Sequence, residues 1–203
     1  MSRLDPTLGF ARARLHVAAV DPRQTFGRIY LTRYPEPLGC SNAPSRFSDP
    51  RRRVVKNRFG VLYLGNTLKV CFLEAILRDQ RNGVIGDYVI RESKLRSRRY
   101  VLIEPTSRLY LVDLRRDGCV RMGIPSDVPR SANQALARRW SLAFYQHPSE
   151  PDGIIYPSRL NEETNLAIYD RAVVKLREVG NTDLVGAPGF AEVLDDLRVA
   201  IAP

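Results

Sequence analysis

Short apolar runs of strand length, separated by irregular connections, constrain the fold of this chain more than any other feature. Clear examples are "VLYLG" (61–65), "LYLVDL" (109–114) and "NLAIYD" (165–170). Runs of this length, rich in β-branched and aromatic residues, are typical of strands. The helical segments between them do not alternate regularly with the strands, as they would in a doubly wound sheet. The pattern therefore predicts an α+β fold with mixed or antiparallel sheets and interspersed helices.

The chain is expected to have three parts: an N-terminal arm at 1–23, a main domain at 24–172 and a C-terminal extension at 173–203. The segment 165–170 is expected to be the last strand of the chain, and further strands are expected at 24–33, 88–90, 99–105 and 152–158. The segment from Tyr34 to Gly60 is long and irregular, as functional loops often are. The extension holds an amphipathic helix, with one apolar face made by Phe190, Val193, Leu194 and Leu197.

The chain of 203 residues carries a formal net charge of +10, and its arginines cluster at 51–53, 94–99 and 115–116. Such clusters attract polyanions, including nucleic acid, phosphate-rich small molecules and acidic proteins. A solvated basic surface has the same composition, so charge alone does not decide the function.

Metal and disulfide chemistry have little support in the sequence. Cys40, Cys71 and Cys119 are widely spaced and odd in number, which argues against a disulfide framework. His16 and His147 have no neighbouring ligand pattern, so no metal site is expected. No apolar run has the length of a membrane span and the N-terminus has no signal-peptide core, so a cytoplasmic location is expected.

The stretch "KVCFLEAILRD" (69–79) places one carboxylate, Glu74, inside an otherwise apolar segment. Thr67 can cap a helix from Leu68 to about Asp79. That helix is apolar on nearly every side, and Glu74 falls within one of its apolar stripes. Two interpretations remain open: a buried carboxylate paired with an arginine or reaching the helix edge, or a carboxylate positioned to face a cavity. A second helix is expected to begin at the capping-box pattern of Ser131 and Gln134.

Two arginines and one serine are further candidates for a site. Arg28 lies within the apolar strand "FGRIYL", where its side chain needs an anion or an acidic partner. Arg46 follows the turn-forming "SNAPS" and suits bidentate phosphate recognition. Ser158 ends a strand in "IIYPSRL" without a nucleophile elbow, so a hydrogen-bonding role is favoured over nucleophilic catalysis. No Gly-rich phosphate loop is present.

Six segments, in order, resemble the RES domain, a family named for an arginine, a glutamate and a serine. The resemblance covers roughly residues 24–172. The segments are "GRIYLTR", "SNAPSRF", "VLYLG", "FLEAIL", "LYLVDL" and "DGIIYPSRLN". One departure is Ser45, where the family usually has glycine before its second arginine.

The resemblance implies a fold like that of ADP-ribosyltransferase toxins and an activity that depletes NAD⁺ by hydrolysis or phosphorolysis. It implies that Arg28 and Arg46 hold the NAD⁺ phosphates and that Tyr63 stacks on the nicotinamide end. Glu74 matches the catalytic glutamate and Ser158 the serine of the family name. Tyr30 is a further candidate for the pocket lining.

The resemblance also implies no resident cofactor, since NAD⁺ is the substrate and inorganic phosphate is the second substrate in phosphorolysis. The implied partner is a cognate antitoxin of the Xre type that presents acidic groups to the arginines, with nucleic acid contacted only through it. A homodimer is left open. ADP-ribosyl transfer to a macromolecule is an alternative in the same pocket, and a basic nucleic-acid-binding module is an alternative of another class.

Overall fold

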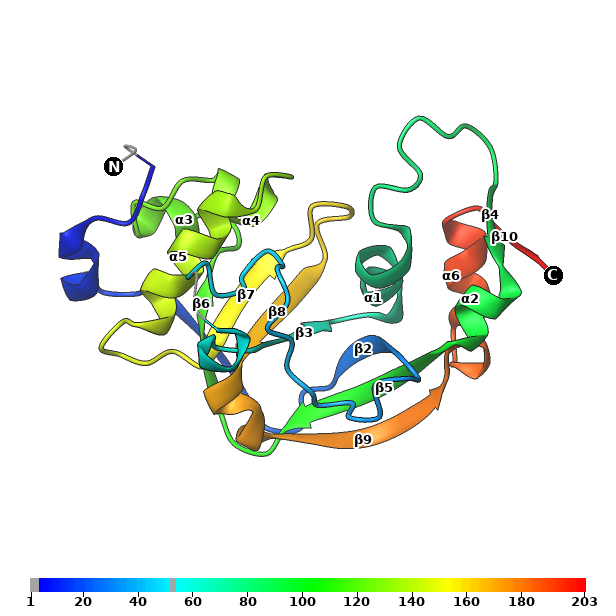
Figure 1. Ribbon diagram of the computed structural model, residues 1–203, viewed down its shortest axis with the longest axis horizontal. Helices are drawn as coiled ribbons and strands as arrows, with labels where there is room; N and C mark the ends of the chain where they lie inside the picture. Colours follow the sequence, from blue (N-terminus) through cyan, green and yellow to red (C-terminus); the bar gives the residue numbers. More distant parts are fainter. Residues whose placement is uncertain (1–3, 52–53) are drawn as a thin grey trace.

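An eight-stranded mixed sheet forms the centre of the computed structural model, which describes residues 4–51 and 54–203 (Figure 1). The strand order is β1-β6-β7-β8-β3-β2-β5-β9, and every neighbouring pair is antiparallel except β6 and β7. The strands of this sheet are β1 (Val17–Val20), β2 (Phe26–Leu31), β3 (Val61–Gly65), β5 (Arg98–Pro105), β6 (Leu109–Asp113), β7 (Gly153–Pro157), β8 (Thr164–Tyr169) and β9 (Leu176–Asp183). The predicted α+β class with a mixed sheet is confirmed.

Helices cover the curled sheet in two groups, one at each end of the molecule (Figure 1). The first group is α3 (Gly118–Arg121), α4 (Asp127–Arg130) and α5 (Ala135–Tyr145). The second is α1 (Leu68–Phe72), α2 (Glu92–Arg96) and α6 (Phe190–Asp196), next to a small parallel sheet of β4 (Tyr88–Arg91) and β10 (Val199–Ala202). The short 3-10 turns are η1 (Leu8–Arg12), η2 (Val55–Asn57), η4 (Asp170–Lys175) and η5 (Leu184–Gly186).

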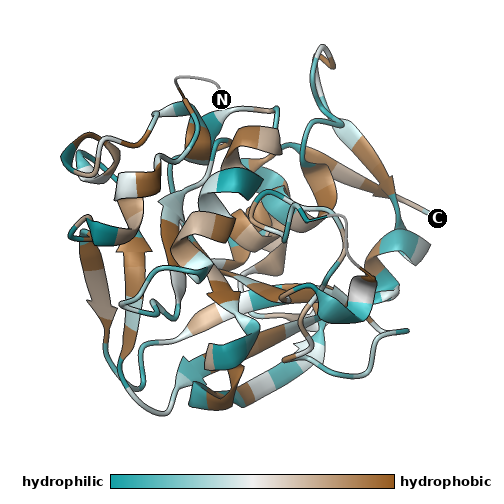
Figure 2. Ribbon diagram, turned by 60° about the vertical axis from the view of Figure 1, so that its left-hand side comes forward, coloured by the Kyte–Doolittle hydropathy of each residue, from teal (hydrophilic) through white to brown (hydrophobic). Residues whose placement is uncertain are grey.

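Alternation along the strands separates the core into layers. In β3, Val61 belongs to the cluster beneath α5, whereas Leu62 and Leu64 belong to the cluster on the opposite face. A third cluster joins α1 to α6. Figure 2 shows hydrophobic residues concentrated on the strands and hydrophilic residues in the connections. Burial on both faces explains why these strands appear in the sequence as continuous apolar runs.

Both expected extensions contribute strands to the main sheet. β1, from the expected arm, pairs with β6, and β9, from the expected extension, pairs with β5. The prediction that 165–170 is the last strand is wrong, because β9 and β10 follow it. The expected amphipathic helix is α6, and its apolar face packs against the core cluster of α1. The first three residues of the arm lie outside the described residues.

The helix predicted at 68–79 is present, but it changes type halfway. Thr67 caps α1 by accepting a hydrogen bond from the N–H of Val70 at 3.1 Å. A π-helical turn, η3 (Leu73–Leu77), follows directly and ends at Arg78. Wider turns of this kind occur frequently at functional sites, because they change the direction in which side chains point.

The predicted capping box at Ser131 is wrong. Helix α5 begins at Ala135, and the side chain of Gln134 makes no capping hydrogen bond. Instead, Ser131 Oγ accepts from the N–H of Asn133, and Asn133 Oδ1 accepts from the N–H of Ala135. These local turns compete with helix formation, so the helix begins at Ala135 and not at Ser131. Its buried residues include Trp140 and Phe144.

The pairing between β2 and β3 is confined to Gly27 and Gly65, so the sheet has an open seam at this point. Glycine is required at position 65 because a Cβ there would lie 2.6 Å from Val70 Cγ1 and 2.8 Å from Cys71 Sγ. Helix α1 therefore packs directly on the backbone of β3 beside the seam.

Candidate active site

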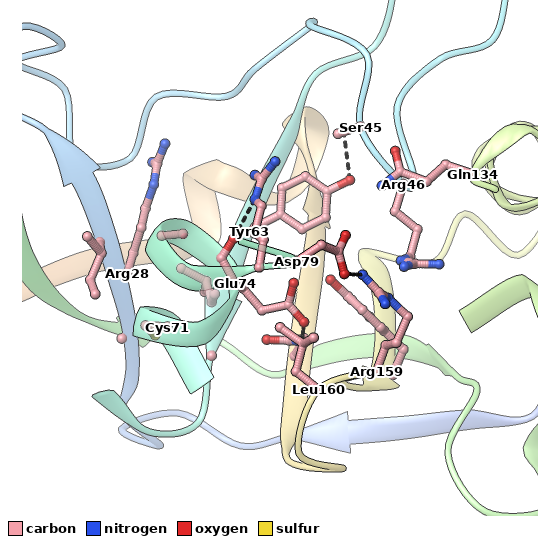
Figure 3. Close-up of a pocket in the computed structure, with 18 of the residues that line it drawn as sticks. Arg28, Ser45, Arg46, Tyr63, Cys71, Glu74, Asp79, Gln134, Arg159 and Leu160 are labelled. Atoms are coloured by element: carbon pink, nitrogen blue, oxygen red, sulfur yellow. Dashed lines mark hydrogen bonds and ion pairs between the residues drawn. The ribbon is translucent and has the colours of Figure 1, made fainter. Parts of the chain in front are cut away.

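A cavity of about 330 Å³ opens beside this seam (Figure 3). Its lining comes from β2, β3, the α1–η3 helix, the loop before Phe47 and the β7–β8 region. Of the predicted site residues, the cavity lining includes Arg28, Arg46, Tyr63 and Glu74.

Glu74 faces this cavity from the π-helical turn. Its Oε1 accepts hydrogen bonds from Ser158 Oγ at 2.8 Å and from Asn165 Nδ2 at 3.1 Å. Within residues 4–51 and 54–203, no cation forms an ion pair with this carboxylate and Oε2 has no hydrogen-bond donor. Of the two interpretations of Glu74, the structure therefore favours the carboxylate that faces a cavity.

Ser158 lies behind Glu74 and not in the cavity lining. The side chain is completely buried, and its Oγ also accepts a hydrogen bond from the N–H of Leu160 at 3.1 Å. The hydroxyl thus accepts one hydrogen bond, from Leu160, and donates its own proton to the carboxylate of Glu74. This geometry gives Ser158 the hydrogen-bonding role favoured from sequence, acting through Glu74.

Asn165 is a site residue that the sequence analysis missed. It is 4% exposed, at the start of β8, and it both lines the cavity and donates to Glu74. A polar residue heading the buried run "NLAIYD" was the available signal, because a buried amide requires a partner.

Two tyrosines form the apolar part of the wall. The Tyr63 hydroxyl accepts a hydrogen bond from the N–H of Phe47 at 2.9 Å and lies 2.9 Å from Ser45 Oγ. Ser45, the departure from the usual glycine, therefore helps to hold Tyr63. Tyr156, also missed, packs edge-on against Phe47. Burial raises the pKa of both phenols, so both are neutral hydrogen-bonding groups.

Arg28 and Arg46 line the cavity with one nitrogen each anchored to the backbone. Arg28 Nη1 donates to the carbonyl of Pro37 at 2.5 Å, and Arg46 Nη1 donates to the carbonyl of Ser131 at 2.7 Å. Burial lowers the pKa of Arg28, but a guanidinium remains charged at neutral pH. Each side chain keeps further donors for an anion.

Two more arginines line the cavity and were not predicted. Arg159 Nη2 forms an ion pair with Asp79 Oδ1 at 2.5 Å, and the hydrogen bond from Arg159 lowers the pKa of that carboxyl (Figure 3). Arg78 donates from Nε to the carbonyl oxygen of Glu74 at 2.7 Å. Both look like ordinary surface arginines in the sequence, and no local pattern marks them.

A second cavity, of about 650 Å³, shares four lining residues with the first: Arg28, Ile29, Ala75 and Arg78. Tyr30 lies here and not in the Glu74 cavity, and its hydroxyl accepts a hydrogen bond from Asn181 Nδ2 at 3.0 Å. The structure thus places Tyr30 outside the Glu74 cavity. Of the other predicted site residues, only Arg28 lines the second cavity with it.

Among the described residues, no cysteine thiol or histidine imidazole forms a hydrogen bond with Glu74, Ser158 or Asn165. Burial raises the pKa of Cys71 to about 12 and that of Cys40 to about 11. In the described ranges no three His, Cys, Asp or Glu side chains come together as a potential metal site.

The basic clusters are partly neutralised by nearby carboxylates. Arg51 pairs with Asp49, and Arg115 pairs with Asp113 at 2.7 Å. Arg52 and Arg53 lie outside the described residues. In both pairs the carboxylate is more buried than the arginine, so these arginines hold local structure as well as contributing to the basic surface. The described part of the chain also has no helix long and apolar enough to cross a membrane.

The fold and the site define a class of α+β protein in which a cavity beside an open sheet seam combines one fixed carboxylate with several arginines. The RES domain model matches residues 26–185, and the chain belongs to this family, as its resemblance predicted. The match extends past residue 172 and includes β9.

Two known proteins are similar to this chain. A protein of Sinorhizobium fredii named "Probable toxin y4kH" is 39% identical over 126 residues, which are 62% of this chain and 99% of that protein. A chain in the crystal structure of the M. tuberculosis MbcT–MbcA toxin–antitoxin complex matches with a TM-score of 0.62 and 15% identity, covering 95% of this chain and 98% of that chain. The second likeness is one of fold.

Proposed function

We propose that this protein is the toxin of a toxin–antitoxin pair and that it cleaves the nicotinamide–ribose bond of NAD⁺ in the Glu74 cavity. The observation that carries the proposal is the environment of Glu74. Two neutral donors hold Oε1, no described cation neutralises the carboxylate, and Oε2 is free to interact with a ligand.

Such a carboxylate suits glycosidic cleavage of a pyridinium nucleotide. The C1′–N bond breaks with its electron pair passing to the nicotinamide nitrogen, and nicotinamide leaves as a neutral molecule. The ribose acquires the positive charge of an oxocarbenium-like transition state, as in glycoside hydrolysis. A fixed negative charge close to the ribose stabilises that charge as it develops. Water or inorganic phosphate then adds to C1′, and an attacking water releases one proton.

The remaining cavity residues orient the substrate. Arg28 and Arg46 suit the diphosphate, because each is anchored at one nitrogen and keeps other donors free. Tyr63 and Tyr156 provide aromatic surface for the nicotinamide ring. Holding the two ends of the substrate fixes the ribose beside Glu74, and such orientation supplies a large part of the rate enhancement of an enzyme.

Support for the toxin role comes from the names of the two similar proteins. The proposed partner is an antitoxin of the Xre type whose acidic groups meet the cavity arginines, and the proposed site of action is the cytoplasm, where NAD⁺ is available.

The test is product identification with purified protein. NAD⁺ is incubated with and without inorganic phosphate, and products are assigned by mass spectrometry. ADP-ribose indicates hydrolysis, and ADP-ribose 1″-phosphate indicates phosphorolysis. Glu74→Gln should reduce turnover by at least about 100-fold while the protein stays folded. Unimpaired NAD⁺ loss in Glu74→Gln would refute the assignment.

The two alternative functions give different results in the same experiment. ADP-ribosyl transfer would release nicotinamide but leave ADP-ribose attached to a protein or nucleic acid supplied with it. A nucleic-acid-binding module would leave NAD⁺ intact, bind DNA or RNA with steep salt dependence, and be indifferent to Glu74→Gln.

A further inference from the structure

The two cavities adjoin at a boundary, here called the neck, that carries one arginine on each side. The β2 side of the neck is formed by Arg28 and Ile29, and the helical side by Ala75 and Arg78, because these four residues line both cavities. A ligand that occupied both cavities would have to pass between the two arginines.

Arg78 is the most available anion donor of the arginines that line the Glu74 cavity. Its Nε is anchored on the carbonyl oxygen of Glu74, which fixes the direction of the guanidinium. Its two terminal nitrogens have no partner among the described residues. Arg28 and Arg46 each give one terminal nitrogen to a carbonyl, and Arg159 is paired with Asp79.

The backbone of Arg78 is strained. Its φ is 44° and its ψ is −125°, a conformation that L-residues rarely adopt and that glycine adopts readily. Its N–H still closes the π-helical turn by donating to the carbonyl of Leu73 at 2.7 Å. Backbone strain of this kind is concentrated at active sites and ligand-binding positions, where the function requires a particular side chain despite the unfavourable conformation.

We propose that Arg78 binds the diphosphate of a dinucleotide at the neck between the cavities, opposite Arg28, with the adenosine half of the ligand in the second cavity. This assignment rests on the proposed function for the identity of the dinucleotide. Two guanidinium groups from opposite sides match the two charges of a diphosphate, and each can donate more than one hydrogen bond. Arg78 is thus a substrate-binding residue whose Nε is hydrogen-bonded to the backbone carbonyl of Glu74, the residue that carries the catalytic carboxylate.

The main test compares two substrates with the same scissile bond. NAD⁺ contains the diphosphate, whereas nicotinamide riboside lacks it. Arg78→Gln should lower kcat/KM for NAD⁺ by about 10- to 100-fold, mostly through KM, because it removes charged hydrogen bonds. The value for nicotinamide riboside should change by less than about twofold, since that substrate has no group for Arg78 to bind.

Three further variants separate binding from a structural role. Arg96→Gln removes the same charge on α2, outside both cavities, and should leave both substrates unaffected. Arg78→Lys should recover only part of the NAD⁺ activity, because lysine lacks the planar fork of donors. Arg78→Gly should lose NAD⁺ affinity while its Tm stays equal to or above that of the wild-type protein, because glycine relieves the strained φ.

Equal losses on NAD⁺ and nicotinamide riboside, with a reduced Tm for Arg78→Gly, would assign Arg78 a structural role and overturn the proposal. Unchanged kinetics of Arg78→Gln on NAD⁺ would overturn it as well. If the wild-type protein cleaves neither substrate, the proposed function fails and calorimetry with ADP-ribose decides the binding proposal separately. Binding of ADP-ribose that is at least tenfold weaker in Arg78→Gln supports the proposal, and absence of binding to the wild-type protein overturns it.

Discussion

The two sides of the Glu74 cavity differ in charge, in burial and in how their hydrogen-bond donors are used. One side, here called the wall, consists of the lining residues Tyr63, Tyr156 and Asn165 together with Ser158, which lies behind Glu74 and outside the lining. The other, the rim, consists of Arg28, Arg46, Arg78 and Arg159.

The wall is neutral, largely buried and hydrogen-bonded within the protein. Ser158 and Asn165 are 0% and 4% exposed, and both direct their donors to one oxygen of Glu74. The rim is charged and partly exposed, and each of its arginines uses only some of its donors on the protein. The difference indicates that the wall fixes the Glu74 carboxylate, whereas the rim keeps donors that an anionic ligand could use.

Among the variants that compare the wall with the rim, the largest effect is expected from removing a donor of the wall. Asn165→Ala should lower kcat by about 10- to 100-fold with little change in KM, because Glu74 Oε1 loses one of two hydrogen bonds that fix it. Ser158→Ala should act similarly, and the double variant should lose less than the product of the two effects, since both donors serve one oxygen. Steady-state kinetics with NAD⁺ measure these values.

The matched variant of the rim is Arg46→Gln, which should raise KM more than it lowers kcat. If wall and rim variants showed the same division between kcat and KM, the functional contrast between the two sides would be wrong.

A smaller effect is expected where β3 supports the helix that carries Glu74. Gly65→Ala places a methyl group against Val70 and Cys71, so α1 must shift. The expected cost is about 1–3 kcal/mol of unfolding free energy, accompanied by a lower kcat. Gly180→Ala in β9 is the control, because the nearest atom to its Cβ would be 3.7 Å away, an ordinary contact. Thermal unfolding and NAD⁺ turnover of both variants test this, and equal behaviour would contradict it.

The smallest effect concerns Asp49, which anchors the loop that follows Arg46. Burial alone would raise the pKa of Asp49, but hydrogen bonds from Arg51 and from the N–H of Phe59 hold it below its usual range. A carboxyl with a depressed pKa stabilises the folded state at neutral pH and loses this contribution in acid.

Asp49→Asn should therefore lower stability by about 1 kcal/mol at pH 7, and the difference from the wild-type protein should shrink as the pH falls below about 4. Tm measured across this range provides the test. A difference that grew toward acid pH would contradict the assigned direction of the pKa shift.

The sequence predicted the parts of the site that lie in distinctive local patterns. Glu74 was visible as a carboxylate in an apolar helix, and Ser158 as a polar residue at a strand end. Asn165 and Arg78 were missed because their importance depends on which elements lie beside them. An asparagine that begins a strand and an arginine that ends a helix are common, and only the tertiary structure places one beside a carboxylate and the other at a neck.

The same limit explains the missed strands. β1 is only four residues long, and β9 has one buried residue, Leu176, in the whole of "LREVGNTD". Edge strands bury little apolar surface, so periodicity does not reveal them. The π-helical turn has no sequence signal that distinguishes it from an α-helix, although it determines where Glu74 points.

The hydrogen bonds to Glu74 span long stretches of chain: 84 residues separate it from Ser158 and 91 from Asn165. A ribosome adding about 5–20 residues per second needs on the order of ten seconds to cover that interval. During this time the nascent chain carries the carboxylate without either donor and without β7 or β8. A polypeptide chain that is terminated before Ser158 also lacks both hydrogen-bond donors to Glu74. Translation itself thus delays the completed site until most of the polypeptide exists, and prematurely ended chains never acquire it.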